Sequence, residues 1–214
     1  KGGEGVCQVP DTASPSAHWG EGTGEVGLSP NRLTEGITNM PENSLPLAHL
    51  KVLDLTRVRG GPACVRMLAD WGADAIRVET PPAQSGEDGY TGDRHSSDFQ
   101  NLHRNKRSLT LNLKHAEAKE IFAKLVAQSD IVVENYRPDV KFRLGVDYES
   151  LKAINPRIIL GSLSGFGQDG PYANRPGVDQ IAQGMGGMMA GTGFPDGGPI
   201  RAGSAIGDLT GGLF

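Results

Sequence analysis

Residues 50–80 read LKVLDLTRVRGGPACVRMLADWGADAIRVET, and this stretch decides the fold class. The apolar run 50–56 has the length and composition of a buried strand. After Pro62, a favourable first-turn residue, apolar side chains recur at helical spacing, and Gly72 then provides a helix stop. A second strand is expected at 74–80. Strand, helix and strand in this order are the repeating unit of a parallel sheet.

The same alternation continues along the chain. Asp147 can cap a short helix that ends at Ile154, because an Asn-Pro pair follows and cannot continue it. Further strands are expected at 130–136 and 157–165. These elements predict an α/β fold, an open, mostly parallel, Rossmann-like sheet with helices on both faces and functional residues after the strand ends. Another amphipathic helix is indicated by Ala118, Ile121, Phe122, Leu125 and Val126.

Composition places the chain among globular proteins and argues against several function classes. It has 214 residues, of which 37% are hydrophobic and 21% charged, and its formal net charge is −4. This balance gives no reason to expect nucleic acid or an anionic membrane as a partner. The two cysteines, Cys7 and Cys64, are too few for a disulfide framework or a metal site of paired cysteines. With no apolar run of ~18 residues and no signal-peptide pattern, we expect a cytoplasmic protein that uses no metal.

Residues 1–46 differ from the rest of the chain. They are rich in Gly, Ser, Thr, Pro and Glu and have no apolar periodicity, so they cannot bury enough surface to offset the entropy of ordering. We expect a segment that is disordered or a non-native leader. Two alternatives stay open: the natural protein starts at Met40, or the segment is a genuine flexible tail.

Nucleotide-binding patterns are missing where the first expected strand ends. A nicotinamide site needs G-x-G-x-x-G there, whereas residues 57–66 read RVRGGPACVR. The sequence has no P-loop pattern either, so we expect neither a nicotinamide cofactor nor ATP. Cations do gather near the expected strand ends, where they suit either an anionic, phosphate-rich ligand or plain solvation. They are Arg57, Arg59, Arg104, Lys106, Arg107, Lys114, Arg137, Lys141 and Arg143.

A glycine-rich segment, residues 184–212, ends in GSAIGDLTGG. Such glycines either let backbone N–H groups face a ligand or merely permit tight turns. Asp208 follows a glycine there and precedes an expected helix. A carboxylate in that place accepts hydrogen bonds from the first N–H groups and feels the helix dipole, and both effects keep it ionised. From the residues alone, Asp208 is either an ordinary N-cap or a functional carboxylate.

Six sequence blocks follow one another between residue 47 and the end of the chain. They are VLDLTRVRGGP (52–62), LADWGADAIRVE (68–79), HRNKRSLTLNLK (103–114), DIVVENYRPD (130–139), RLGVDYESLKAINPRIILGSLSGFGQDGPY (143–172) and GSAIGDLTGG (203–212). In this order they resemble the family III CoA-transferases, the CaiB–BaiF type. The resemblance implies that residues 47–214 are the N-terminal part of the family's large domain, truncated at the C-terminus. It also implies a homodimer of interlocked subunits in the full-length form.

The resemblance further implies which residues carry the reaction. Asp208 stands where the family has an aspartate nucleophile, which forms an aspartyl-CoA thioester as CoA moves from an acyl-CoA to a small carboxylic acid. No metal and no nucleotide cofactor are implied. Lys114 and Arg143 would neutralise phosphates of coenzyme A, and Leu111 and Tyr136 would flank its apolar parts. The residues implied to bind coenzyme A are Arg57, Val58, Arg59, Gly60, Thr80, Leu111, Asn112, Leu113, Lys114, Asn135, Tyr136, Arg137, Arg143 and Leu144.

Departures from the family pattern leave alternatives open. α-Methylacyl-CoA racemases of the same fold carry a His in a G-H-D stretch, whereas Gly177-Val178-Asp179 stands here, which favours transfer over racemisation. Arg59 replaces the Gln of formyl-transferring members, so formate and oxalate are not assigned as substrates. Family members are much longer, and we therefore expect this piece alone to be unstable or inactive. A third interpretation is a catalytically inactive CoA-binding module.

Overall fold

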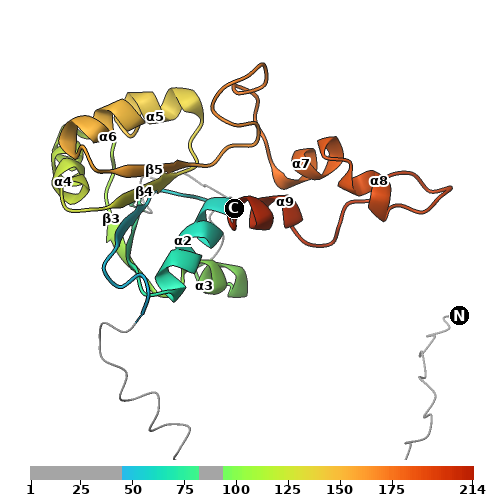
Figure 1. Ribbon diagram of the computed structural model, residues 1–214, viewed down its shortest axis with the longest axis horizontal. Coiled ribbons are helices and arrows are strands. Elements are labelled where there is room, and N and C mark those ends of the chain that lie inside the picture. The colour runs from blue at the N-terminus through green and yellow to red at the C-terminus, as the bar shows by residue number, and fades with distance from the viewer. Residues whose placement is uncertain (1–44, 82–93) are drawn as a thin grey trace, which may run out of the picture. The chain divides into compact units, whose positions relative to one another are not determined.

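The alternation of strands and helices produces a five-stranded, all-parallel sheet (Figure 1). The computed structural model describes residues 45–81 and 94–214. Strand neighbours follow the order β3-β2-β1-β4-β5, so the chain builds outward from β1 to one edge and then to the other. This doubly wound order is that of Rossmann-like sheets and confirms the predicted fold class. The strands are β1 (Lys51–Asp54), β2 (Asp74–Glu79), β3 (Lys106–Thr110), β4 (Ile131–Glu134) and β5 (Ile159–Ser162).

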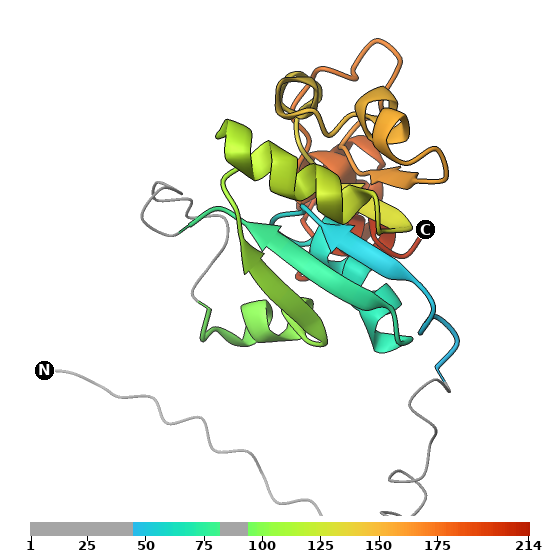
Figure 2. The ribbon, with the colours of Figure 1, turned by 90° about the vertical axis from the view of Figure 1, so that its left-hand side faces the viewer.

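Helices cover both faces of the sheet (Figures 1 and 2). α4, α5 and α6 lie on one face, and α2 and α3 lie on the other, with α9 packed against α2. α7 and α8 lie farther out, beyond α9. The bounds are α2 (Gly60–Asp70), α3 (Ser97–His103), α4 (Ala116–Val126), α5 (Pro138–Leu144), α6 (Tyr148–Ile154), α7 (Asp179–Met185), α8 (Met188–Thr192) and α9 (Ile206–Gly211).

The two faces of the sheet bury separate apolar clusters, because successive side chains of a strand point to opposite sides. Leu53 of β1 belongs to the cluster that contains Phe122 of α4 and Leu151 of α6. Its neighbour Val52 belongs to the cluster that contains Val65 of α2. Burial on both faces leaves the edge at the strand ends as the place for polar side chains.

The predicted helix ends are confirmed. Gly72 follows α2 with a φ of 103°, a conformation that favours glycine. Asp147 caps α6, and its Oδ1 accepts a hydrogen bond of 3.1 Å from the Ser150 N–H. Ile121 of α4, which the sequence pattern assigned to an apolar helical stripe, is nevertheless exposed, as is Trp71 just past the end of α2.

Strand β3 is not indicated by the sequence pattern, so the strand expected third, at 130–136, is the fourth. Its sequence, KRSLT, is mostly polar, because β3 lies at an edge of the sheet and most of its residues are exposed. Its register against β2 pairs Arg77 with Ser108 and Glu79 with Thr110. Backbone pairing rather than apolar burial therefore defines this strand.

Residues 1–44 of the segment expected to be disordered, including the alternative start at Met40, lie outside the described residues, whereas Leu45 accepts a backbone hydrogen bond of 3.1 Å from the Ala48 N–H. Within 45–81 and 94–214, no helix has the length and apolar character to cross a bilayer.

Candidate active site

The strand order reverses between β1 and β4, the place where open parallel sheets bind ligands. From β1 the chain enters α2 on one face, and from β4 it enters α5 on the other. The Arg57 N–H donates to Asn135 Oδ1 at 2.9 Å, and Asn135 Nδ2 donates to the Arg57 carbonyl at 2.7 Å. The Asn135 side chain thus holds the two turns together where the site lies.

A cavity of about 1090 Å³ opens at this edge of the sheet. It is lined by residues at and after the ends of β1, β2, β3 and β4. Of the fourteen residues implied to bind coenzyme A, all except Arg59 and Gly60 line it, and their contact with the ligand stays a prediction. The twelve that line it are Arg57, Val58, Thr80, Leu111, Asn112, Leu113, Lys114, Asn135, Tyr136, Arg137, Arg143 and Leu144.

Positive charge dominates the cavity lining. Among the described residues of the lining, Glu79 is the single carboxylate. It pairs with Arg77 at 2.9 Å and also with Arg94. The surface therefore suits a ligand with several negative charges. The cationic side chains of the lining are Arg57, Arg77, Arg94, Lys114, Lys119, Arg137 and Arg143.

The part of the cavity built by β2 and α3 was missed by sequence reasoning. Arg77 is buried, which lowers the pKa of its guanidinium, while the charge of Glu79 opposes that shift. The guanidinium carbon lies 4.9 Å from the centre of the Phe99 ring. Within the described part of the chain, Arg77 Nε has no hydrogen-bond partner. A charged residue at an inward strand position is the sequence signal that could have revealed this part of the site.

The cavity lining also has apolar side chains, among them Leu111, Leu113, Tyr136, Val140 and Leu144. Tyr136 packs against the core cluster under α4, and burial raises the pKa of its hydroxyl. The Arg57 guanidinium carbon lies 5.9 Å from the Tyr136 ring centre. A ligand with both phosphate and apolar parts matches these two kinds of surface.

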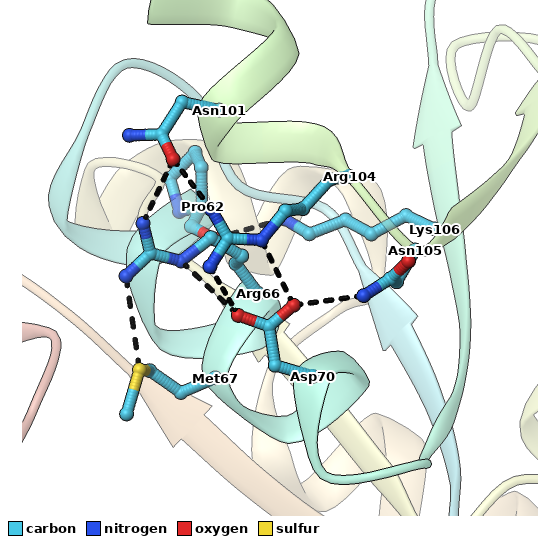
Figure 3. Close-up of polar contacts among 8 residues, drawn as sticks. All are labelled: Pro62, Arg66, Met67, Asp70, Asn101, Arg104, Asn105 and Lys106. Atoms are coloured by element: carbon cyan, nitrogen blue, oxygen red, sulfur yellow. Dashed lines mark hydrogen bonds and ion pairs between the residues drawn. The ribbon is translucent and has the colours of Figure 1, made fainter. Parts of the chain in front are cut away.

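A buried ion pair fixes the turn between β1 and α2. Lys106 Nζ lies 2.8 Å from Asp54 Oδ2, and the two side chains are 1% and 0% exposed. Lys106 Nζ also donates to the Pro62 carbonyl at 2.9 Å (Figure 3), and Asp54 Oδ1 accepts from the Thr56 N–H at 2.9 Å. Val58, within the turn, has a φ of 67°, which is costly for a β-branched residue. The ion pair therefore anchors a strained turn from both ends.

Asp70 anchors the connection between α3 and β3 to α2 (Figure 3). Its carboxylate accepts hydrogen bonds from Arg104 at 2.6 and 3.0 Å and from Asn105 at 2.9 Å. The hydrogen bond from Arg104 lowers the pKa of Asp70. Arg107 lies 2.6 Å from Asp74. Both arginines were candidates for binding a phosphate, and both instead form ion pairs outside the cavity lining.

The turn after β4 has a buried carboxylate of its own. Glu134 Oε2 accepts a hydrogen bond of 2.8 Å from the Tyr136 N–H, and Lys141 Nζ lies 3.7 Å from Oε1. Lys141 also donates to Gln168 and is buried. This lysine, another candidate phosphate ligand, therefore serves the packing of the turn.

Asp208 is the third residue of α9, which begins at Ile206. The helix starts before Asp208, not after it, and Ala205 occupies the N-cap position. Burial raises the pKa of the Asp208 carboxyl, the Asp179 carboxylate raises it further, and Arg59 opposes both. Lost solvation and the second carboxylate therefore oppose the effects that were expected to keep Asp208 ionised at this position.

The N-terminus of α2 connects the cavity with Asp208. Val58 lines the cavity, and a Cβ on Gly60 would lie 3.0 Å from the Asp208 carbonyl oxygen. A Cβ on Gly212 would lie 2.4 Å from the Gly60 carbonyl oxygen, so glycine is required for α9 to approach α2 this closely. Gly60 therefore lies next to the backbone of Asp208, and the Arg59 charge acts on the Asp208 carboxyl. Neither residue lines the cavity.

The groups of the site that could take part in a reaction are the Asp208 carboxylate and the cations of the cavity lining. Among the described residues, no three His, Cys, Asp or Glu side chains are grouped so that they could hold a metal ion. The site and the sheet together define an α/β protein with a cationic cavity at the switch point and a partly buried carboxylate on a neighbouring helix.

Comparison with known proteins places this arrangement in a family. Residues 47–214 match the model of CoA-transferase family III, and the chain belongs to that family. It is 42% identical over 189 residues to the succinate–glutarate CoA-transferase of Agrobacterium fabrum, a match covering 83% of this chain and 47% of the relative. It is 46% identical over 175 residues to the acetyl-CoA:oxalate CoA-transferase of Acetobacter aceti, covering 79% and 44%. The chain thus spans less than half the length of these relatives.

Solved structures agree in fold. A CaiB/BaiF family protein from Brucella suis is 41% identical with a TM-score of 0.69, and the match covers 79% of this chain and 46% of that one. A hypothetical protein from Mycobacterium tuberculosis is 31% identical with a TM-score of 0.70, covering 79% and 47%. The family resemblance read from the sequence blocks is confirmed.

Proposed function

We propose that the protein containing this chain moves coenzyme A from an acyl-CoA to a small carboxylic acid through an aspartyl-CoA thioester on Asp208. The observation that carries the proposal is the cationic cavity at the switch point, whose lining leads through Val58 to Gly60 and the backbone of Asp208. Membership of the family supports the transfer of CoA. The aspartyl thioester on Asp208 can be tested by substitution of Asp208 and by trapping the thioester with hydroxylamine.

Coenzyme A combines phosphate groups with a less polar pantetheine arm, and the cavity has a surface for each. We assign the phosphates to Lys114 and Arg143, two exposed cations of the lining. Leu111 and Tyr136 would flank the less polar part of the ligand. The acyl thioester would then reach Asp208 past Val58.

The proposed reaction is a sequence of acyl transfers without net proton transfer. The Asp208 carboxylate attacks the donor thioester carbonyl and the C–S bond breaks. CoA departs as the thiolate, and a mixed anhydride of Asp208 and the donor acid remains. The thiolate attacks the aspartyl carbonyl, which releases the donor as a carboxylate and leaves the aspartyl-CoA thioester. The acceptor carboxylate then attacks this thioester, the C–S bond breaks, and a second anhydride forms as CoA thiolate is released. The thiolate attacks the acceptor carbonyl of that anhydride, which gives the new acyl-CoA and frees the Asp208 carboxylate.

Two features of the site favour this chemistry. Each transfer passes through an oxyanion, for which the glycine-rich segment 203–212 offers backbone N–H donors. Burial raises the pKa of Asp208, which makes its carboxylate more basic and also limits the access of water to an anhydride.

We propose a dicarboxylic acid as the acceptor class. Arg59 is the cation that acts on Asp208, and it is held by Asp98 of α3 at 3.1 Å. Its guanidinium would bind the carboxylate of the acceptor that does not react. The names of the relatives include succinate, glutarate and oxalate.

Proton transfer of the racemase kind has less support. Val178 is the N-cap of α7 and is 54% exposed, and its side chain cannot carry a proton. Loss of the α-proton of a branched acyl-CoA to deuterated water, without CoA exchange, would be the observation that favours racemisation.

The test is CoA exchange by the complete protein that contains this sequence. Acetyl-CoA, succinyl-CoA and formyl-CoA are each incubated with acetate, succinate, glutarate and oxalate, and the acyl-CoA products are separated by chromatography. The proposal predicts at least one new acyl-CoA, with a dicarboxylate as the best acceptor. A protein that binds CoA tightly and exchanges none of these pairs is a binding module, which would contradict the proposal.

Removing both assigned phosphate ligands should weaken CoA binding strongly. In the double variant Lys114→Ala/Arg143→Ala, we expect the Kd for CoA to rise about 100-fold, because each charge-assisted hydrogen bond contributes ~1.5 kcal/mol. Calorimetry at low and high salt measures the change, which should shrink as salt screens the charges. The matched control is Lys124→Ala/Arg157→Ala, two exposed cations outside the cavity lining. Equal affinities of the two double variants would contradict the assignment.

A further inference from the structure

Asp179 is a buried carboxylate at the first position of α7. Its Oδ1 accepts a hydrogen bond of 2.9 Å from the Gly207 N–H and lies 3.5 Å from the Asp208 nitrogen. These are N–H groups of the first turn of α9, which lack partners within their own helix. Because the N-cap residue Ala205 makes no side-chain hydrogen bond, the cap of α9 comes from another helix.

The contact extends to the segment before α9. Gln183, one turn after Asp179 on α7, donates through Nε2 to Asp179 Oδ2 at 2.7 Å and to the Ser204 carbonyl at 3.1 Å. Its Oε1 accepts from the Ala202 N–H at 2.9 Å. Two buried side chains of α7 therefore hold residues 202–207, the approach to the helix that carries Asp208.

Gly207 is required for the same contact between α7 and the first turn of α9. A Cβ there would lie 3.2 Å from both Asp179 Oδ1 and the Ala182 Cβ. The absence of a side chain lets the backbone of α9 come close enough for the Asp179 carboxylate to reach its N–H groups. The sequence G-D at 207–208 thus serves both a close approach and the placing of Asp208.

We propose that Asp179 is the positioning residue for Asp208: it fixes the first turn of α9 from α7 and so sets where the Asp208 carboxylate meets the thioester. This inference rests on the proposed function of Asp208. Small displacements of a reacting group cost about 100-fold in rate. A loosened first turn should therefore lower kcat while leaving the cavity that binds CoA intact.

The charge of Asp179 gives the proposal a second readout. The charged groups that act on Asp208 are Asp179 on α7 and Arg59 on the α2 side, and Arg201 lies 3.6 Å from Asp179 Oδ2. Cys64 approaches α9 through its backbone nitrogen. Burial is the larger cause of the raised pKa of Asp208, and the Asp179 charge raises this pKa further. Because Asp208 reacts as the carboxylate, activity should fall as pH drops through this raised pKa. Removing the Asp179 charge should move that acid limb to lower pH.

The experiment compares Asp179→Ala and Asp179→Asn in the complete protein that contains this sequence. We expect Asp179→Ala to lower kcat about 100-fold with little change in KM for acyl-CoA, and to speed amide hydrogen exchange at Gly207 and Asp208. Asp179→Asn keeps an oxygen for the Gly207 N–H but no charge, so it should restore part of kcat and shift the acid limb downward. If the alanine variant does not fold, the asparagine variant decides through its pH profile.

The matched control is Asp147→Ala, which removes a buried helix cap from α6 outside the cavity lining. A kcat loss in Asp179→Ala no larger than in Asp147→Ala, or an unmoved acid limb in Asp179→Asn, would overturn the proposal. Failure of the proposed function is recognised separately, because the wild-type protein would then exchange no CoA or Asp208→Ala would exchange it normally. The amide exchange of Gly207 and Asp208 reports the cap in either case.

Discussion

Asp208→Ala is expected to lower the rate of CoA exchange by about 10,000-fold or more, because a proposed nucleophile has no substitute in the mechanism. Binding of CoA, measured by calorimetry, should change little, since Asp208 does not line the cavity. Loss of turnover with retained binding separates a nucleophile from a residue that only holds the ligand. Asp208→Asn, which keeps the shape of the side chain, should be equally inactive in exchange.

Glu149→Gln is the matched control for this prediction. Like Asp208, Glu149 lies in the first turn of a short helix, here α6, but it is exposed and outside the cavity lining. Its exchange rate should equal that of the wild type. An Asp208→Ala protein that exchanges CoA as fast as Glu149→Gln would remove Asp208 from the reaction.

Lys106→Met is expected to destabilise the protein by about 3–5 kcal/mol, because it leaves the Asp54 carboxylate buried without its cation. Burial lowers the pKa of Lys106, and the Asp54 charge opposes that shift. Each buried charge is therefore stabilised by the other. The free energy of unfolding in denaturant measures the loss. Because Lys106 also binds the Pro62 carbonyl, the turn from Arg57 to Gly60 should loosen as well.

A second substitution tests whether the unpaired charge is the cause. The double variant Asp54→Asn/Lys106→Met should recover much of the lost stability, since an amide can still accept the hydrogen bond from the Thr56 N–H. Lys124→Met, on the exposed side of α4, is the control for the loss of a lysine. A free energy of unfolding of Lys106→Met equal to that of Lys124→Met would show that the buried pair does not stabilise this turn.

The fold could be predicted from the sequence where local rules decide it. The strand, helix and strand of residues 50–80 follow from apolar spacing, Pro62 and Gly72, and the cap at Asp147 follows from its side chain. β3 could not be found this way, because an edge strand is held by backbone pairing and its residues KRSLT show no apolar pattern. α3 carried a usable signal, since Ser96 caps it by accepting from the Phe99 N–H.

The site was predictable only in part, because its residues meet through tertiary contacts. Twelve of the residues implied by the family resemblance line one cavity, yet Arg77 and Phe99 come from elements whose part in it no motif indicated. The N-cap alternative for Asp208 was wrong because α9 begins at Ile206. Asp179 reaches α9 from 28 residues away in sequence, and no local pattern indicates such a contact.

Asp208 is expected to become covalently linked to CoA during the reaction. The complete protein is incubated with an acyl-CoA and then with hydroxylamine, which displaces the thiolate from an aspartyl thioester and leaves a hydroxamate, and peptides are mapped by mass spectrometry. We predict a hydroxamate on Asp208 that requires acyl-CoA and is absent from Asp208→Ala. An active protein with no modification at Asp208, or with the hydroxamate on another carboxylate, would contradict it.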